Sequence, residues 1–199
     1  MMVHMKLYAV ALAALLPAAA VVPDIDPGKA FGNPGAPVTV QVFSDYECPS
    51  CKLFHDTTLP TLIHDYVSTG KVYLVYRDFP LPMHRYSREA AGYACAAAHL
   101  SLYQPVADAL FRAQASWSNT GKVWDVVAGV LTESQRKKVQ AMAASPEVLG
   151  EIQRDLDAGH KEAVDSTPTL IVSRGSKKYP VSGGMNYVLL RQLIDDVSK

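Results

Sequence analysis

The sequence lacks the features that would assign it to several large classes of proteins. Only three of its 199 residues are cysteine, too few for a scaffold built on disulfides. Neither sign of charge is in excess, because nineteen basic residues balance nineteen acidic ones, so we expect no nucleic-acid partner. Disorder is excluded as well, since 49% of the residues are apolar. The length allows one domain, or a domain with an insertion.

Long hydrophobic runs are scarce, except at the N-terminus. There, Lys6 precedes an apolar stretch over residues 7–22 that is about 16 residues long, short of the roughly 20 that span a bilayer. Three alanines at 18–20 supply the small residues that a signal peptidase needs. We therefore predict a signal peptide over residues 1–20, with an uncleaved anchor as the alternative. Either one places the folded chain in the periplasm or another extracytoplasmic compartment, where disulfides persist.

The rest of the chain predicts the order β-α-β, a block of helices, then β-β-α. Residues 21–37 are rich in proline and glycine and are expected to be irregular. Strands are predicted at 38–43, 71–77, 169–172 and 177–181. Helices are predicted at 51–69 (split by Pro60), 85–102, 104–115, 122–130, 132–144, 145–161 and 185–197. Together these elements indicate an α/β protein with a helical insertion.

The pair Cys48-Pro49-Ser50-Cys51 carries the most information about function. A zinc half-site would need two more ligands, but Cys95 lies in an alanine-rich helical stretch and the six histidines show no ligand-type spacing. Haem attachment requires histidine after the second cysteine, where Lys52 stands. A redox dithiol needs a strand that leads to the pair and a helix that begins there, which fits. We therefore expect no metal and no cofactor besides the Cys48-Cys51 disulfide itself.

The two cysteines are expected to have different roles. At a helix start, free N–H groups and the helix dipole favour a thiolate, so Cys48 is predicted to be the exposed nucleophile with a low pKa. Cys51, one turn further on, would be the more buried resolving thiol, and the reaction would pass through a mixed disulfide. Pro49 fits the first turn because it has no N–H to lose, and Ser50 can donate a hydrogen bond to sulfur.

Other residues near the pair have two interpretations each. Lys52 either favours the thiolate or is a solvated surface lysine, and His55 is expected to be structural, with a catalytic role as the alternative. Thr167-Pro168 stands directly before a predicted strand, and we expect its peptide bond to be cis, with an ordinary trans bond as the alternative. Cys95 is expected to be a small buried core residue, with a regulatory or intermolecular thiol as the alternative.

Three segments together resemble the DsbA-like branch of the thioredoxin superfamily. They are Phe43-Ser44-Asp45-Tyr46-Glu47-Cys48-Pro49-Ser50-Cys51, Tyr76-Arg77-Asp78-Phe79-Pro80-Leu81-Pro82-Met83-His84 and Ser166-Thr167-Pro168-Thr169. The resemblance implies a thioredoxin fold interrupted by an all-helical insertion. The thioredoxin-like domain would comprise residues 38–83 and 163–199, and the insertion residues 84–162.

The resemblance also implies a secreted thiol:disulfide oxidoreductase that gives its disulfide to reduced, newly exported proteins. A membrane quinone-linked partner of the DsbB or vitamin K epoxide reductase type would reoxidise it, and we expect a monomer. The candidate catalytic residues are Cys48, Cys51 and Pro168. The candidate supporting residues are Pro49, Ser50, Thr167, Glu47 and Lys52.

Two departures from the best-known members leave the direction of electron flow open. Those members have histidine where Ser50 stands, and an acid where Val42 stands, for which Glu47 is a candidate substitute. A disulfide reductase or isomerase of the same fold is therefore the first alternative, although isomerases usually carry a dimerisation domain that we do not expect here. A glutathione-dependent transferase and a non-catalytic peptide-binding module are alternatives from other classes.

Overall fold

A computed structural model of the chain describes residues 25–183 and 186–199. The predicted signal peptide lies outside these residues. Among the described helices, none is long and apolar enough to cross a membrane.

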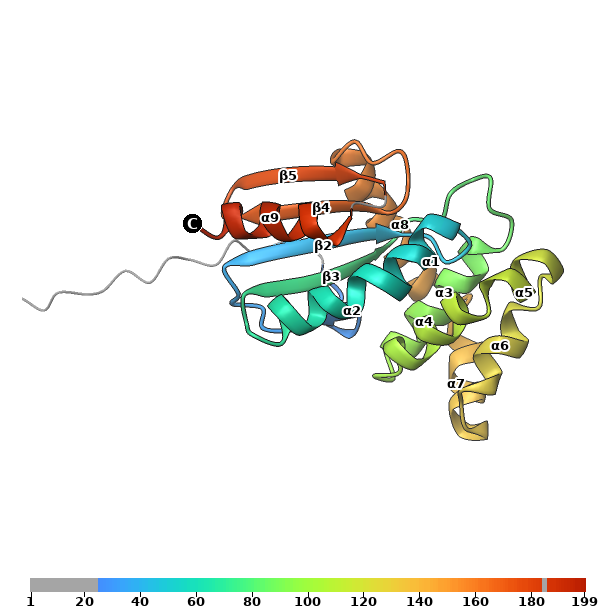
Figure 1. Cartoon of the computed structure of the whole chain (residues 1–199). Helices are drawn as coiled ribbons and strands as arrows, with labels where there is room; N and C mark the ends of the chain where they lie inside the picture. The colour runs from blue at the N-terminus through green and yellow to red at the C-terminus, as the bar shows by residue number, and fades with distance from the viewer. Residues whose placement is uncertain (1–24, 184–185) are drawn as a thin grey trace, which may run out of the picture.

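A five-stranded mixed sheet forms the centre of the fold (Figure 1). Its strands are β1 (Ala30–Phe31), β2 (Val38–Ser44), β3 (Val72–Asp78), β4 (Thr169–Arg174) and β5 (Lys177–Ser182), in the spatial order β1-β3-β2-β4-β5. Only β2 and β3 are parallel. The short edge strand β1 falls in the segment expected to be irregular, and its two residues were too few to show a pattern.

The register of the central strands sets the position of the site. Phe43, near the end of β2, lies opposite Thr169, the first residue of the antiparallel strand β4. The chain just after β2 and the chain just before β4 therefore meet at one end of the sheet. These two segments hold the cysteine pair and Thr167-Pro168.

Helices cover both faces of the sheet (Figure 1). One face carries α9 (Tyr187–Val197) and a helical run after β2, which comprises α1 (Pro49–Leu53), η2 (Phe54–Thr58), α2 (Leu59–Leu62) and η3 (Ile63–Val67). The predicted break at Pro60 does not occur, because the chain stays helical from Pro49 to Val67. Pro60 instead stands in the first turn of α2, directly after the π-helical turn η2, where its missing N–H costs less.

Six helices lie between β3 and β4. They are α3 (Ser87–Ala98), α4 (Tyr103–Arg112), α5 (Gln114–Thr120), α6 (Val123–Gly129), α7 (Glu133–Met142) and α8 (Pro146–Lys161). The sequence prediction missed α5, which carries no apolar periodicity. The last helix begins where predicted, with Ser145 capping the N–H of Val148 and Pro146 in the first turn. It covers the second face of the sheet, so α8 packs with the thioredoxin core although it falls within residues 84–162.

A buried cluster of charges joins α8 to the sheet. Lys29 Nζ lies 2.7 Å from Asp78 Oδ2 and 2.5 Å from Asp155 Oδ2, and Arg77 donates to Asp155 Oδ1 at 2.8 Å. Burial alone would lower the pKa of Lys29, but the two carboxylates raise it well above its ordinary value. The cluster thus holds two cations against two anions away from water.

Close contact between α8 and the sheet requires glycine at position 159. A Cβ atom there would lie 2.5 Å from Cε2 of Phe79 and 3.1 Å from Cδ1 of Phe43, and these two rings already pack edge to face. Neither ring can move without disturbing the other, so a methyl group cannot be accommodated.

We predict that Gly159→Ala destabilises the protein, although alanine is the better helix former. Overpacking should lower the free energy of unfolding by about 1–3 kcal/mol, measured by urea denaturation. The matched control is Gly150→Ala in the same helix, whose Cβ would meet only Arg154 Nη1, at 3.7 Å. That substitution should stabilise by roughly 0.5–1 kcal/mol. Equal effects of the two substitutions would contradict this packing.

Candidate active site

The cysteine pair lies at the start of α1, just after the loop that follows β2. Cys48 occupies the N-cap position, Pro49 is the first helical residue, and Cys51 lies one turn along. Both cysteines are free thiols, and Cys51 is the more buried, with 1% of its surface exposed. The expectation that Cys48 is exposed is wrong, because only 7% of its surface is accessible. The loop before β4 covers it, and the carbonyl oxygen of Thr167 lies 3.3 Å from its Sγ.

The surroundings of the two sulfur atoms separate their pKa values. A hydrogen bond from Cys51 lowers the pKa of Cys48 from its ordinary value near 9 to about 5, against the opposing effect of burial. The backbone N–H groups of Cys51 and Ser50 add to this lowering. Burial and the adjacent Cys48 raise the pKa of Cys51 far above its ordinary value. The pair therefore combines one ready thiolate with one thiol that keeps its proton.

The Thr167-Pro168 peptide bond is cis, as predicted. Its loop is tied to the sheet on the far side, where Gly183 N–H donates to the Pro168 carbonyl at 2.9 Å. Thr167 and Pro168 are both buried, and this segment lies against Cys48.

Asp45 organises the loop that leads to Cys48. Its buried carboxylate accepts hydrogen bonds from the backbone N–H of Glu47 at 2.8 Å and of Leu81 at 2.7 Å. It also contacts His84 Nδ1 at 2.8 Å and Ser87 Oγ at 2.5 Å. One side chain thus connects the cysteine loop to the start of the helical block, and its backbone N–H lies 3.4 Å from Cys51 Sγ.

Gln114 is a further site residue that the sequence prediction missed. It lies at the start of α5, and its side-chain amide donates to the carbonyl oxygens of Tyr46 at 2.7 Å and Cys48 at 3.0 Å. A single glutamine separated from Cys48 by 66 residues gives no signal in the sequence. The helical block therefore takes part in shaping the cysteine loop.

The supporting residues named from the sequence do not all reach the sulfur atoms. Ser50 contributes through its backbone N–H. The Glu47 carboxylate accepts the backbone N–H of Tyr86 at 2.7 Å, and the Lys52 ammonium lies 2.5 Å from Asp56. Both charged groups thus have other partners, which favours the solvated-surface interpretation of Lys52.

His55 has a structural environment, as expected. Its Nε2 lies 3.1 Å from Asp108, and its ring stacks on Phe111 with 4.6 Å between the ring centres. Burial lowers the pKa of His55. The residue therefore joins the helical run after β2 to α4.

Known proteins share this architecture. A sequence model of the thioredoxin family matches residues 26–196. Disulfide bond formation protein D of Bacillus subtilis (strain 168) is 24% identical over 162 residues, which cover 76% of this chain and 70% of that protein. The structure of a thioredoxin-like oxidoreductase from Silicibacter pomeroyi DSS-3 is 27% identical, with a TM-score of 0.70 over 85% of this chain and 92% of that one.

Alpha-DsbA1 of Wolbachia pipientis is 21% identical to this chain and has a TM-score of 0.74. The match covers 90% of this chain and 93% of that structure, and shows a common fold. These likenesses confirm the fold class predicted from the sequence, a thioredoxin fold interrupted by helices.

We predict that Cys48 of the reduced protein is alkylated by iodoacetamide with a rate that is half-maximal near pH 5, because the thiolate is the nucleophile. The rate should fall as the pH drops through about 5. Cys51→Ala removes a hydrogen-bond donor and should move the midpoint upward. Mass spectrometry of quenched samples measures the modified fraction at each cysteine. A midpoint near that of an ordinary thiol, about 8.5, would contradict the site geometry.

Proposed function

This chain belongs to the thioredoxin family as a DsbA-like thiol:disulfide oxidoreductase, and from this premise we propose that it is exported and introduces disulfides into reduced proteins. The observation that carries the direction of transfer is the low pKa of Cys48 beside the high pKa of Cys51.

A stabilised thiolate makes the corresponding disulfide a stronger oxidant. At pH 7 a thiol with a pKa of about 5 is ionised, which favours the reduced pair by roughly 60 mV over an ordinary thiol. The pair should therefore pass its disulfide on to substrates rather than accept one from them.

The transfer proceeds in two exchange steps. A substrate thiolate attacks Cys48 Sγ of the disulfide, the Cys48–Cys51 bond breaks, and Cys51 leaves and takes up a proton. A second substrate thiolate then attacks the substrate sulfur of the mixed disulfide, and Cys48 leaves as a thiolate. Two electrons pass from substrate to enzyme, and the low pKa of Cys48 makes it a good leaving group in the second step.

The loop before β4 suits an extended peptide substrate. The Thr167-Pro168 segment lies next to Cys48, with the Thr167 carbonyl oxygen 3.3 Å from Sγ. A substrate strand lying along this loop would bring its cysteine to Cys48. We assign Pro168 this positioning role.

The proposed activity also requires that the protein is exported and that its reduced cysteine pair is reoxidised. The apolar N-terminal segment would act as a signal peptide cut after Ala20, and the folded chain would work as a monomer outside the cytoplasm. The reduced pair would be reoxidised by a membrane quinone-linked protein of the DsbB or vitamin K epoxide reductase type. Disulfide formation in exported proteins fits an oxidising compartment.

We predict a reduction potential for the Cys48-Cys51 pair above about −200 mV, measured by equilibration with glutathione and mass spectrometry. Thioredoxin lies near −270 mV and the strong oxidant DsbA near −120 mV. A value near that of thioredoxin would overturn the oxidase assignment in favour of a reductase.

Variants of the pair test the roles of its two cysteines. Cys51→Ala should accumulate mixed disulfides with reduced substrate peptides when Cys48 is first activated with glutathione, because no resolving thiol remains. Cys48→Ala should form none and should lose peptide oxidation, measured as loss of free thiol. The double variant is the background control. Full peptide oxidation by Cys48→Ala would exclude this mechanism.

A further inference from the structure

Three side chains with different metal-binding atoms meet at the side of the helical block. Cys95 lies in the last turn of α3, and His99 is the C-cap residue of that helix, four positions further on, so the two side chains lie on the same side of it. Glu151 reaches them from α8. The Cys95 thiol donates to Glu151 Oε2 at 2.7 Å, and His99 Nε2 lies 3.0 Å from Oε1 and 3.1 Å from Oε2. All three ligand atoms lie within 4.8 Å of one another.

We propose that Cys95, His99 and Glu151 form a binding site for a zinc ion. Thiolate sulfur, imidazole nitrogen and carboxylate oxygen are the ligands that zinc takes in proteins, and four-coordinate sites with three protein ligands keep one position open. Bound zinc would replace the thiol proton, which is released to solvent. A thiolate and a carboxylate then balance the two charges of the ion, so the site carries no net charge where it is buried.

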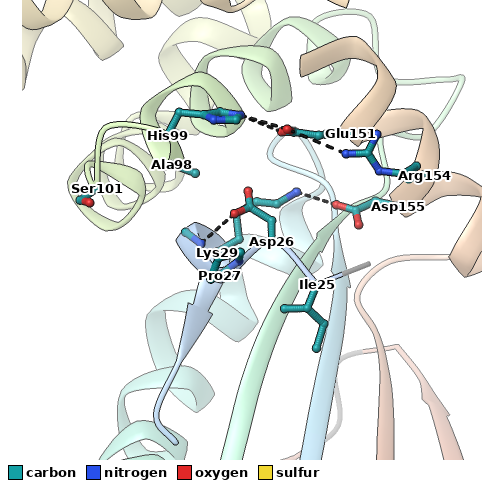
Figure 2. Close-up of a pocket in the computed structure, with 11 residues that line it drawn as sticks. Ile25, Asp26, Pro27, Lys29, Ala98, His99, Ser101, Glu151, Arg154 and Asp155 are labelled. Atoms are coloured by element: carbon teal, nitrogen blue, oxygen red, sulfur yellow. Dashed lines mark hydrogen bonds and ion pairs between the residues drawn. The ribbon is translucent and has the colours of Figure 1, made fainter. Parts of the chain in front are cut away.

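The surroundings give the ion an entry path. A cleft of about 870 Å³ opens beside the three residues and is lined by His99 and Glu151 (Figure 2). The side chains of these two residues are 27% and 13% exposed, whereas Cys95 is fully buried behind them. An ion would enter between His99 and Glu151, meet the sulfur at the closed end, and keep its fourth position toward the cleft.

Neighbouring cations do not block the site. Lys29 lies at the same cleft, but its ammonium is engaged by Asp78 and Asp155 (Figure 2 shows its contact with Asp155). Arg154 Nη2 is 3.9 Å from Glu151 Oε1, and its side chain is exposed, so it can turn to solvent. The ion would displace this weak surface pair and would replace the hydrogen bonds that the three ligands make with one another.

Zinc at this position would also link two parts of the fold. Cys95 and His99 belong to the helical block, whereas Glu151 belongs to the helix that covers the sheet. A bound ion should therefore raise the Tm of the protein.

Zinc titration of the oxidised full-length protein tests the proposal. With Cys48 and Cys51 joined in a disulfide, the remaining thiol is Cys95, which a free-thiol count verifies. Calorimetry should show one zinc ion per chain, and Co²⁺ should give a thiolate-to-metal charge-transfer band. Cys95→Ser and His99→Gln each remove a direct ligand. Each should weaken zinc binding by more than about 10–100-fold, which is the loss that changes to outer-shell partners of a metal typically cause. The Tm increase with zinc should disappear in both.

The matched control is His64→Gln, which removes an exposed histidine on η3 and should leave zinc affinity unchanged. Circular dichroism without metal verifies that each variant folds, and His99, whose side chain is partly exposed, offers a substitution that keeps the core intact. If the wild type takes up no zinc, or if both variants bind it as the wild type does, the three residues are a hydrogen-bonded cluster and the proposal is wrong. These results do not depend on the reaction proposed for Cys48 and Cys51.

Discussion

The arrangement of the whole molecule depends on the buried ion cluster between the sheet and α8. Its members come from three separated places: Lys29 precedes the first strand, Arg77 and Asp78 end β3, and Asp155 lies within α8. Losing one partner of a buried pair leaves an uncompensated charge and costs about 3–5 kcal/mol, so other registers of α8 on the sheet are strongly disfavoured. The helix that ends the helical block leads directly to Thr167-Pro168. The cluster thus helps to fix the loop that covers Cys48.

The chemistry of the site follows from where the fold places two sulfur atoms relative to one helix start. Cys48 lies at the N-cap, and the hydrogen bond from the Cys51 thiol, together with the N–H groups of Cys51 and Ser50, lowers its pKa to about 5. One turn further on, Cys51 meets the interior of the protein, and burial raises its pKa. The helix start was visible in the sequence, because a β-branched strand precedes Cys48 and Pro49 suits the first turn. The order of the two pKa values could therefore be predicted.

Contacts between residues far apart in the sequence could not be predicted. Gln114 and Asp45 hold the cysteine loop through hydrogen bonds to residues up to 68 positions away, and glutamine or aspartate in such segments is common. The expected exposure of Cys48 was wrong for the same reason, since the covering carbonyl belongs to Thr167, 119 residues later. Lys52 was considered as a partner of the thiolate from its spacing alone, but Asp56 competes for it one turn along the helix. Local patterns thus gave the elements, and tertiary packing decided the partners.

The third cysteine shows how far packing separates residues of one type. Cys95 was expected to be a buried core residue, and its place in the hydrophobic core is confirmed, yet its sulfur also donates a hydrogen bond to Glu151. Burial raises the pKa of Cys95, and the negative charge of Asp78 raises it further. This thiol therefore keeps its proton and is inert to the exchange that Cys48 undergoes. The fold therefore keeps a reactive sulfur at a helix start and a protonated sulfur in the helical block, and the two chemistries do not interfere.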